Sequence, residues 1–217
     1  MFKHPRKYWA IVALIFIALI PSQSYTKDHI DGPGIASAHP IATQAGLKIL
    51  EQGGNAFDAA VAVSAALSVV EPYSSGIGGG GFFLLFRSSD NFTTFIDARE
   101  VAPGMSEPDM YLDSDRNFIP RSSLVGPLAS GIPGLPAALA HVAENYGNLS
   151  LKQSLQPAIK LAEEGFPVYS RLNTALNVAS RSSNLSPKFK EIFLPCLLYT
   201  SDAADDTPCV DLGGRRI

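Results

Sequence analysis

Residues 56–70, AFDAAVAVSAALSVV, constrain the fold most because they are apolar nearly all the way around a helix. A helix of this kind is stable when it is buried between other layers of the structure. Its alanines and serines are small enough to let a sheet or a second helix approach closely. Asn55 can cap the helix, Asp58 lies favourably in its first turn, and Glu71-Pro72 ends it. We therefore expect a layered fold with this helix inside.

The segments around this helix predict one antiparallel hairpin and further amphipathic helices. Apolar residues recur at helical spacing over 42–52 and 135–146, and each stretch ends at a glycine. FFLLF (82–86) has the composition of a strand buried on both faces, and FTTFI (92–96) follows it after the turn RSSDN (87–91). This order of elements indicates an α+β or layered α/β body.

The second half of the chain is expected to be mainly helical. Residues 101–133 are rich in proline and glycine, which predicts irregular structure. Ser150 and Gln153 form a capping box, and Pro157 predicts the start of a new helix. Residues 170–193 are expected to be helical with a polar face.

The glycine run GIGGGG (76–81) formally matches the dinucleotide-binding pattern G-x-G-x-x-G. That mechanism needs a strand before the run and a helix after it, whereas here a helix precedes and a strand follows. The glycines instead predict a backbone that approaches a neighbour closely or adopts positive φ. The sequence has no G-x-S-x-G motif, so Ser74, Ser75 and Ser130 are interpreted as turn serines.

Arg99 is the most informative single residue because it follows directly after the second predicted strand. A guanidinium at the end of a strand can bind a carboxylate through two parallel hydrogen bonds. The alternative is a structural ion pair with Asp97, Glu100 or another acid. Spacing alone favours the ion pair.

Charge and cysteine content exclude several classes of function. The net charge of −3 provides no basic field for nucleic acid. Residues 26–195 contain no cysteine, which excludes a disulfide scaffold, a cysteine nucleophile and a cysteine-based zinc site there. The histidines of this body, His29, His39 and His141, do not fall at ligand spacing, so we expect no metal site.

Residues 1–24 have the pattern of a cleaved export signal. Lys3 to Lys7 form a positive segment, and residues 9–20 form an apolar run that is shorter than the ~20 residues a membrane span needs. Pro21 then breaks the helix, and Ser24 is a small residue suited to a cleavage site. The alternative is an uncleaved membrane anchor. Either one places the rest of the chain in the periplasm or outside the cell.

Five segments together resemble one enzyme family. They occur in the family's order from about Gly34 to about Phe193: ASAHPIATQAGLKILEQGGNAFDAAVAVSAALSVVEP (36–72), SGIGGGGF (75–82), DAREVAP (97–103), GIPG (131–134) and PAIKLAEEGFPV (157–168). This part of the chain resembles the large subunit of γ-glutamyltranspeptidases, also called glutathione hydrolases.

The resemblance implies an N-terminal-nucleophile hydrolase with a layered αββα fold, of which this chain is only part. Such a precursor cleaves itself, and the new N-terminal threonine of the small subunit attacks the γ-glutamyl amide of glutathione or a related substrate. The γ-glutamyl group then passes to water, an amino acid or a peptide. No metal or organic cofactor is expected. The implied partners are the γ-glutamyl substrate and the small subunit.

The resemblance assigns one site residue to this chain. In the family, the arginine of the D-x-R-E-x-A-P segment binds the α-carboxylate of the γ-glutamyl group, and that role falls on Arg99. The threonines Thr43, Thr93, Thr94 and Thr174 lie inside ordinary predicted elements and lack the context of a processing site. No catalytic residue is therefore assigned, and the isolated chain is expected to be inactive.

The resemblance ends after Phe193. Residues 196–217 hold both cysteines, Cys196 and Cys209, and have no helical stripe. Because parts of this tail look like translated adapter sequence, we expect residues 25–195 to be the partial large-subunit domain and 196–217 to be artefactual. The two cysteines are accordingly not interpreted as a disulfide.

Two other functions remain open from the sequence. One is a non-catalytic exported binding module that uses Arg99 for an acidic ligand. The other is an acylase of the same superfamily that acts on a different amide, such as a β-lactam side chain.

Overall fold

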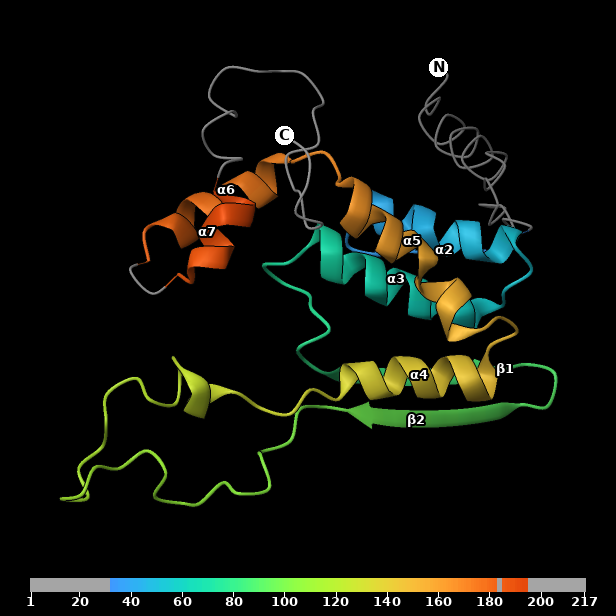
Figure 1. The fold of residues 1–217 in the computed structure, drawn as a ribbon. Helices are drawn as coiled ribbons and strands as arrows, with labels where there is room; N and C mark the ends of the chain where they lie inside the picture. Colours follow the sequence, from blue (N-terminus) through green and yellow to red (C-terminus); the bar gives the residue numbers. More distant parts are fainter. Residues whose placement is uncertain (1–31, 183–184, 195–217) are drawn as a thin grey trace, which may run out of the picture. The chain divides into compact units, whose positions relative to one another are not determined.

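Helix α3 (Ala56–Val70) packs among three other helices in the computed structural model, which describes residues 32–182 and 185–194. Its neighbours are α2 (Pro40–Glu51), α4 (Leu135–Tyr146) and α5 (Leu151–Glu164), as Figure 1 shows. The residues described from Gly34 onward belong to one unit. The expectation that residues 56–70 form a helix buried between layers is confirmed.

The N-terminus of α3 is held by a capping box that also contacts a distant loop. The Asn55 side chain accepts from the backbone N–H groups of Phe57 and Asp58, and the Asp58 carboxylate accepts from Asn55 N. Asp58 is completely buried, and its carboxylate also accepts from the N–H groups of Asn148 at 2.8 Å and Leu149 at 3.3 Å. One side chain therefore caps α3 and orders the connection between α4 and α5.

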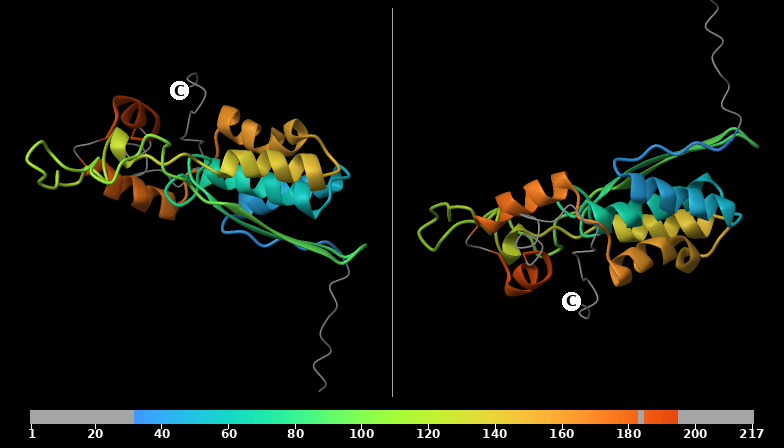
Figure 2. Two further views of the ribbon diagram at one scale, coloured as in Figure 1. Left: turned by 90° about the horizontal axis from the view of Figure 1, so that it is seen from below. Right: turned by 90° about the horizontal axis from the view of Figure 1, so that it is seen from above.

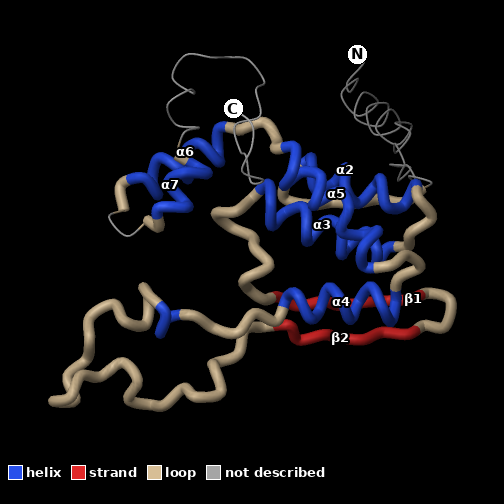
Figure 3. Tube along the Cα trace, in the orientation of Figure 1, coloured by secondary structure: helices blue, strands red, loops and turns tan. Residues whose placement is uncertain are grey.

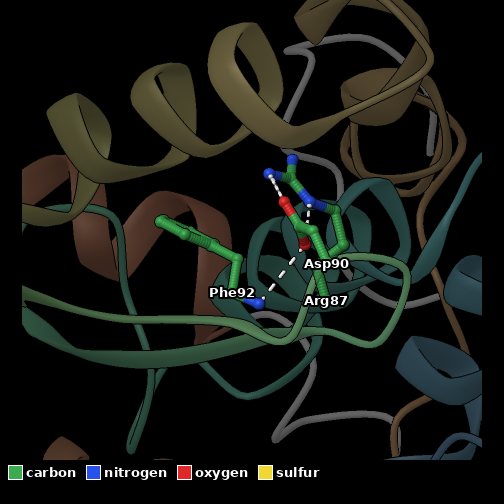
Figure 4. A network of polar contacts seen from close by, with 3 residues as sticks. All are labelled: Arg87, Asp90 and Phe92. Carbon is green, nitrogen blue, oxygen red and sulfur yellow. Dashed lines mark hydrogen bonds and ion pairs between the residues drawn. The ribbon is translucent and has the colours of Figure 1, made fainter.

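The predicted hairpin is confirmed as strands β1 (Gly81–Arg87) and β2 (Phe92–Ala98), paired antiparallel with Gly81 opposite Ala98. Arg87 and Asp90 close its turn through two hydrogen bonds, Nε to Oδ1 at 3.0 Å and Nη2 to Oδ2 at 2.8 Å. Figure 4 shows that Asp90 also accepts from the backbone N–H of Phe92. The hydrogen bonds from the Arg87 guanidinium lower the pKa of Asp90.

Only one face of this hairpin is covered by the described residues. Phe83 and Leu85 on β1 and Ile96 on β2 pack with α3 and α4. The alternate side chains of β1 face away, and Leu84 is 75% exposed. The prediction that FFLLF is buried on both faces is therefore wrong for this structure. The apolar composition of β1 indicates a two-sided environment, but the described residues supply helices on one side alone.

Helix α5 corrects a second expectation. Pro157 does not begin a new helix but lies inside α5, which is continuous from the capping box at Ser150 to Glu164. A proline inside a helix removes one hydrogen bond and crowds the carbonyl of the residue four positions earlier. Leu155 precedes the proline, Ala158 and Leu161 follow it, and all three pack in the core. These core contacts before and after Pro157 stabilise the continuous helix.

Two hydrophobic clusters meet along α3. The first joins α2, α3 and α5 with α6 (Ser170–Ser180), and its largest fully buried side chains are Phe166 and Leu172. The second joins α3, β1 and α4 around Val61, Leu85 and Val142. Two views in Figure 2 show the hairpin on one side of the helices. The core therefore positions the hairpin through one of its faces.

Residues 101–133 connect β2 to α4 as an irregular segment, as predicted, and the tan tube in Figure 3 follows it. This connection contains one short helix, η1 (Pro127–Ala129), and an isolated bridge between Val101 and Ile132. The expected helical region 170–193 consists of α6 and α7 (Pro187–Phe193).

Several expectations lie outside the described residues. These are the export signal at 1–24, His29, and the tail 196–217 with Cys196 and Cys209. Within the described ranges, every helix is too short or too polar to cross a membrane.

Candidate functional site

Arg99 is the first residue after β2, where the strand ends beside the start of β1 (Figure 1). Its backbone N–H donates to Asp97 Oδ1 at 3.0 Å, which fixes the turn leaving the strand. Its side chain is 61% exposed. The predicted position of a guanidinium at the edge of the sheet is confirmed.

The side chain of Arg99 contacts Glu100 rather than Asp97. Arg99 Nε lies 3.4 Å from Glu100 Oε2, and the guanidinium carbon lies 5.9 Å from the centroid of the Phe82 ring. No hydrogen bond from the Arg99 side chain is found to any other described residue. The alternative of an ion pair with a neighbouring acid is therefore observed at Nε, where Glu100 contacts the guanidinium. The other nitrogens of the guanidinium remain available for a ligand.

A pocket of about 390 Å³ lies next to this ion pair. We call it the glycine-run pocket, and its lining residues are Ser64, Leu67, Ser68, Ser74, Ser75, Gly76, Gly79, Gly80, Gly81, Phe82, Phe83, Glu100 and Leu135. The glycine run therefore forms one wall, α3 supplies two serines, and the carboxylate beside Arg99 borders the cavity. Its walls combine glycine backbone, serine side chains and one acid with the apolar side chains of Leu67, Phe82, Phe83 and Leu135, which suits a small ligand with a few polar groups.

The structure distinguishes the two interpretations of the glycine run. None of the described glycines from 76 to 81 has positive φ. A Cβ atom added to Gly79 would lie 3.3 Å from Glu100 Oε1, and one added to Gly80 would lie 2.8 Å from Arg99 Cα. Close approach to a neighbour is therefore confirmed, and the positive-φ alternative is wrong. The helix-before, strand-after order that argues against dinucleotide binding is also observed.

Sequence reasoning missed three polar residues of this pocket. Ser64 and Ser68 lie four residues apart on α3, and both face the cavity. Their spacing within an otherwise apolar helix is a signal that could have identified them. The contact of Glu100 with the glycines had no such signal, because it depends on how separate segments pack.

The turn serines behave largely as expected. Ser74 Oγ donates to Glu71 Oε2 at 2.9 Å and thus serves the turn after α3. Ser75 lies in the same turn, and Ser130 is exposed after η1. Thr43, Thr93, Thr94 and Thr174 lie within α2, β2 and α6, as predicted.

A second pocket of about 470 Å³ lies near the start of α2, with His39, Glu71, Tyr169 and Arg171 in its lining. The Tyr169 hydroxyl donates to the Val70 carbonyl at 2.7 Å, and burial together with Tyr73 raises its pKa. Burial also lowers the pKa of His39, and the charge of Glu71 partly opposes that shift. No local sequence pattern indicates this cluster.

The two histidines among the described residues lie on separate elements. His39 caps α2 by accepting from Ile41 N through Nδ1 at 3.1 Å, and His141 is exposed on α4. Within residues 32–182 and 185–194, no group of three His, Cys, Asp or Glu side chains is arranged to hold a metal ion.

Comparison with known proteins gives one consistent result. The family model described as Gamma-glutamyltranspeptidase matches residues 42–204. The glutathione hydrolase proenzyme of Bacillus subtilis (strain 168) is 44% identical over 162 residues, which are 74% of this chain and 27% of that protein. The corresponding proenzyme of Escherichia coli (strain K12) is 48% identical over 134 residues, covering 62% of this chain and 23% of that protein.

The fold matches a solved structure over part of its length. The crystal structure of gamma-glutamyltranspeptidase from Helicobacter pylori superposes with a TM-score of 0.69 at 38% identity, covering 76% of this chain and 48% of that one. The chain spans about a quarter of the length of the curated relatives it matches.

Proposed function

The chain belongs to the gamma-glutamyltranspeptidase family, and we propose that it supplies part of the large subunit of an exported glutathione hydrolase, or γ-glutamyltransferase. The complete enzyme cleaves the γ-glutamyl amide of glutathione or a related compound and transfers the acyl group to water, an amino acid or a peptide. In this proposal residues 1–24 are the export signal, 25–195 the large-subunit part and 196–217 an artefactual tail.

The observation that carries this proposal is the placement of Arg99. Its guanidinium is 61% exposed on the residue that follows β2, and the Glu100 carboxylate with which it pairs lines the glycine-run pocket. A planar guanidinium with free edges is suited to an α-carboxylate, which accepts two parallel hydrogen bonds from it. The α-carboxylate is the feature that all γ-glutamyl compounds share.

The proposed role of this chain is binding and orientation. Arg99 holds the α-carboxylate, which aligns the γ-amide carbon for attack from one side. The nucleophile, an N-terminal threonine released by self-cleavage, comes from the small subunit. Its oxygen attacks the amide carbon, the amine leaves with a proton, and water or an acceptor amine then releases the γ-glutamyl group.

The uncovered face of the hairpin supports an N-terminal-nucleophile hydrolase fold of the αββα type. Phe82, Leu84, Phe86 and Phe95 are each at least 59% exposed on that face. In the proposed fold, a second sheet and the small subunit cover these side chains. Apolar patches that face water in one part of a protein commonly mark an interface with another part.

The test uses the complete precursor expressed from the genomic reading frame that contains this sequence. We expect it to mature by self-cleavage and to hydrolyse a γ-glutamyl anilide. Arg99→Ala should raise KM by about 10- to 100-fold, because the variant loses a charge-assisted pair of hydrogen bonds. Arg181→Ala, which removes an exposed arginine at the end of α6, is the matched control and should leave KM unchanged.

The outcomes separate the alternatives. An unchanged KM in Arg99→Ala would refute the carboxylate role. Release of a β-lactam side chain in place of the γ-glutamyl group would identify an acylase. Carboxylate binding without turnover by the complete product would identify a binding module. The isolated 217-residue chain should show no turnover of the anilide.

A further inference from the structure

We propose that Gly80 and Gly134 are positioning residues that together hold the backbone at Ala98 and Arg99, and so fix where the Arg99 guanidinium meets its carboxylate. This inference rests on the proposed function. It assigns a substrate-positioning task to two motifs, the glycine run and GIPG, whose sequence separation of about 50 residues gives no hint that they act together.

The two glycines contact the same peptide unit. A Cβ atom on Gly80 would overlap the Ala98 carbonyl oxygen and would lie 2.8 Å from Arg99 Cα. A Cβ atom on Gly134 would overlap the same oxygen and would lie 2.6 Å from Ala98 C and 2.7 Å from Arg99 O. Real Cβ atoms essentially never approach other heavy atoms this closely, so a side chain at either position must displace the backbone that carries Arg99.

Space, not backbone conformation, requires glycine here. Gly134 has φ of −91° and ψ of −26°, which any residue adopts readily. Gly80 is likewise outside the positive-φ glycines of the described chain. An alanine at either position would therefore be unstrained in itself and would act through its methyl group alone.

Hydrogen bonds tie these segments together on both sides of Arg99. Val101 N donates to Ile132 O at 3.2 Å, and Ile132 N donates to Val101 O at 2.8 Å. Leu135 N, one residue after Gly134, donates to Gly79 O at 3.2 Å. The backbone around Arg99 therefore contacts the glycine run and the GIPG segment, and the Arg99 N–H is also bonded to Asp97.

The side chain of the next residue is confined in the same way. A Cβ atom on Gly131 would lie 3.2 Å from Glu100 Cβ, and one on Gly79 would lie 3.3 Å from Glu100 Oε1. Glu100 in turn pairs with Arg99 Nε at 3.4 Å. Paired hydrogen bonds to a carboxylate depend on the position and plane of the guanidinium, and small misplacements in such a site reduce catalysis strongly.

The experiment compares alanine substitutions in the complete precursor. Gly134→Ala and Gly80→Ala are expected to raise KM for a γ-glutamyl anilide by about 10- to 100-fold. Gly104→Ala is the matched control, because Gly104 lies outside the glycine-run pocket and its Cβ atom would have no neighbour within 4 Å. It should leave KM unchanged. Thermal unfolding and self-cleavage are measured for every variant.

A second substrate separates positioning from general damage. The 4-aminobutyryl anilide lacks the α-carboxylate but is otherwise the same acyl donor. Gly134→Ala should leave its low kcat/KM unchanged, and should cause no further loss on the γ-glutamyl anilide when Arg99→Ala is already present. If Gly134→Ala fails to fold, the same comparison is made with Gly131→Ala, whose methyl group displaces Glu100 by only a few tenths of an ångström. This variant should raise KM for the γ-glutamyl anilide and leave kcat/KM for the 4-aminobutyryl anilide unchanged.

Each outcome bears on a different claim. Equal losses on both substrates, additivity with Arg99→Ala, or a KM equal to that of Gly104→Ala would overturn the positioning role while the proposed function stands. A correctly matured wild-type precursor with no γ-glutamyl activity would overturn the proposed function and the positioning role with it.

Discussion

At the residue scale, Asp58 shows where sequence reasoning stops. Its place in the first turn of α3 follows from Asn55 and the apolar run after it, and the capping box is observed. Its bonds to Asn148 and Leu149 come from 90 residues away and could not be read from local pattern. Arg99 is similar. Its position after a strand was predictable, but the close approach of Gly80 and Gly134 to its backbone was not.

Asp58→Ala should be strongly destabilising because it leaves three backbone donors without their acceptor at a fully buried position. We expect the free energy of unfolding to fall by about 3–5 kcal/mol, measured by urea denaturation. Asp58→Asn keeps one acceptor oxygen and should lose less. Asp109→Ala, an exposed acid in the irregular segment, is the control, and an equal loss there would contradict the prediction.

His39 predicts a pH dependence of stability. Burial lowers its pKa below the ordinary value of 6.5, so the unfolded chain takes up a proton that the folded chain resists. The contribution of neutral His39 is therefore complete above pH 6.5 and is lost as the pH falls through the folded-state pKa.

His39→Asn provides the measurement, since asparagine also caps a helix but does not titrate. The decrease in unfolding free energy between pH 7 and pH 5 should be smaller in this variant than in the unmodified chain. The exposed His141→Asn should keep the full decrease. Identical pH profiles for His39→Asn and the unmodified chain would contradict the assignment.

At the scale of elements, the sequence predicted types and most boundaries but not how packing overrides a local rule. The bounds of α3 and α4 follow from caps and apolar spacing, and both agree with the structure. Pro157 was interpreted as a helix start because proline favours a first turn. The core contacts of Leu155 and Ala158 on either side of it decide otherwise.

Pro157→Ala should stabilise the protein, because alanine restores a backbone N–H four residues after the Gln153 carbonyl. We expect a gain of about 2 kcal/mol in unfolding free energy, reduced somewhat by the greater freedom of the unfolded chain. Gln156→Ala on the exposed side of α5 is the control and should change little. A loss of stability in Pro157→Ala would show that the core is fitted to a bent helix.

At the scale of the whole molecule, the uncovered face of the hairpin is the main departure from the sequence prediction. The continuous apolar run of β1 indicates a sheet between two layers, and the described residues supply one. The run therefore predicted an environment that the described residues do not provide, since the side chains of one face are exposed.

The exposed face should govern the solubility of the 217-residue chain. Leu84→Thr with Phe86→Thr should reduce both binding of a hydrophobic dye and light scattering, because the two residues are 75% and 59% exposed. Val178→Thr, which replaces a 64% exposed but separate side chain on α6, should have little effect. Equal dye binding by the double variant and the unmodified chain would contradict this view.

The bridge between Val101 and Ile132 has a consequence for how such a protein can change over evolutionary time. The bridge joins the two ends of the irregular segment, so the residues between Val101 and Ile132 form a closed loop. Lengthening such a loop costs little, about 0.6 kcal/mol for each doubling. Insertions and deletions can therefore accumulate there without moving Arg99, and an epitope or fluorescent label placed there should leave its surroundings intact.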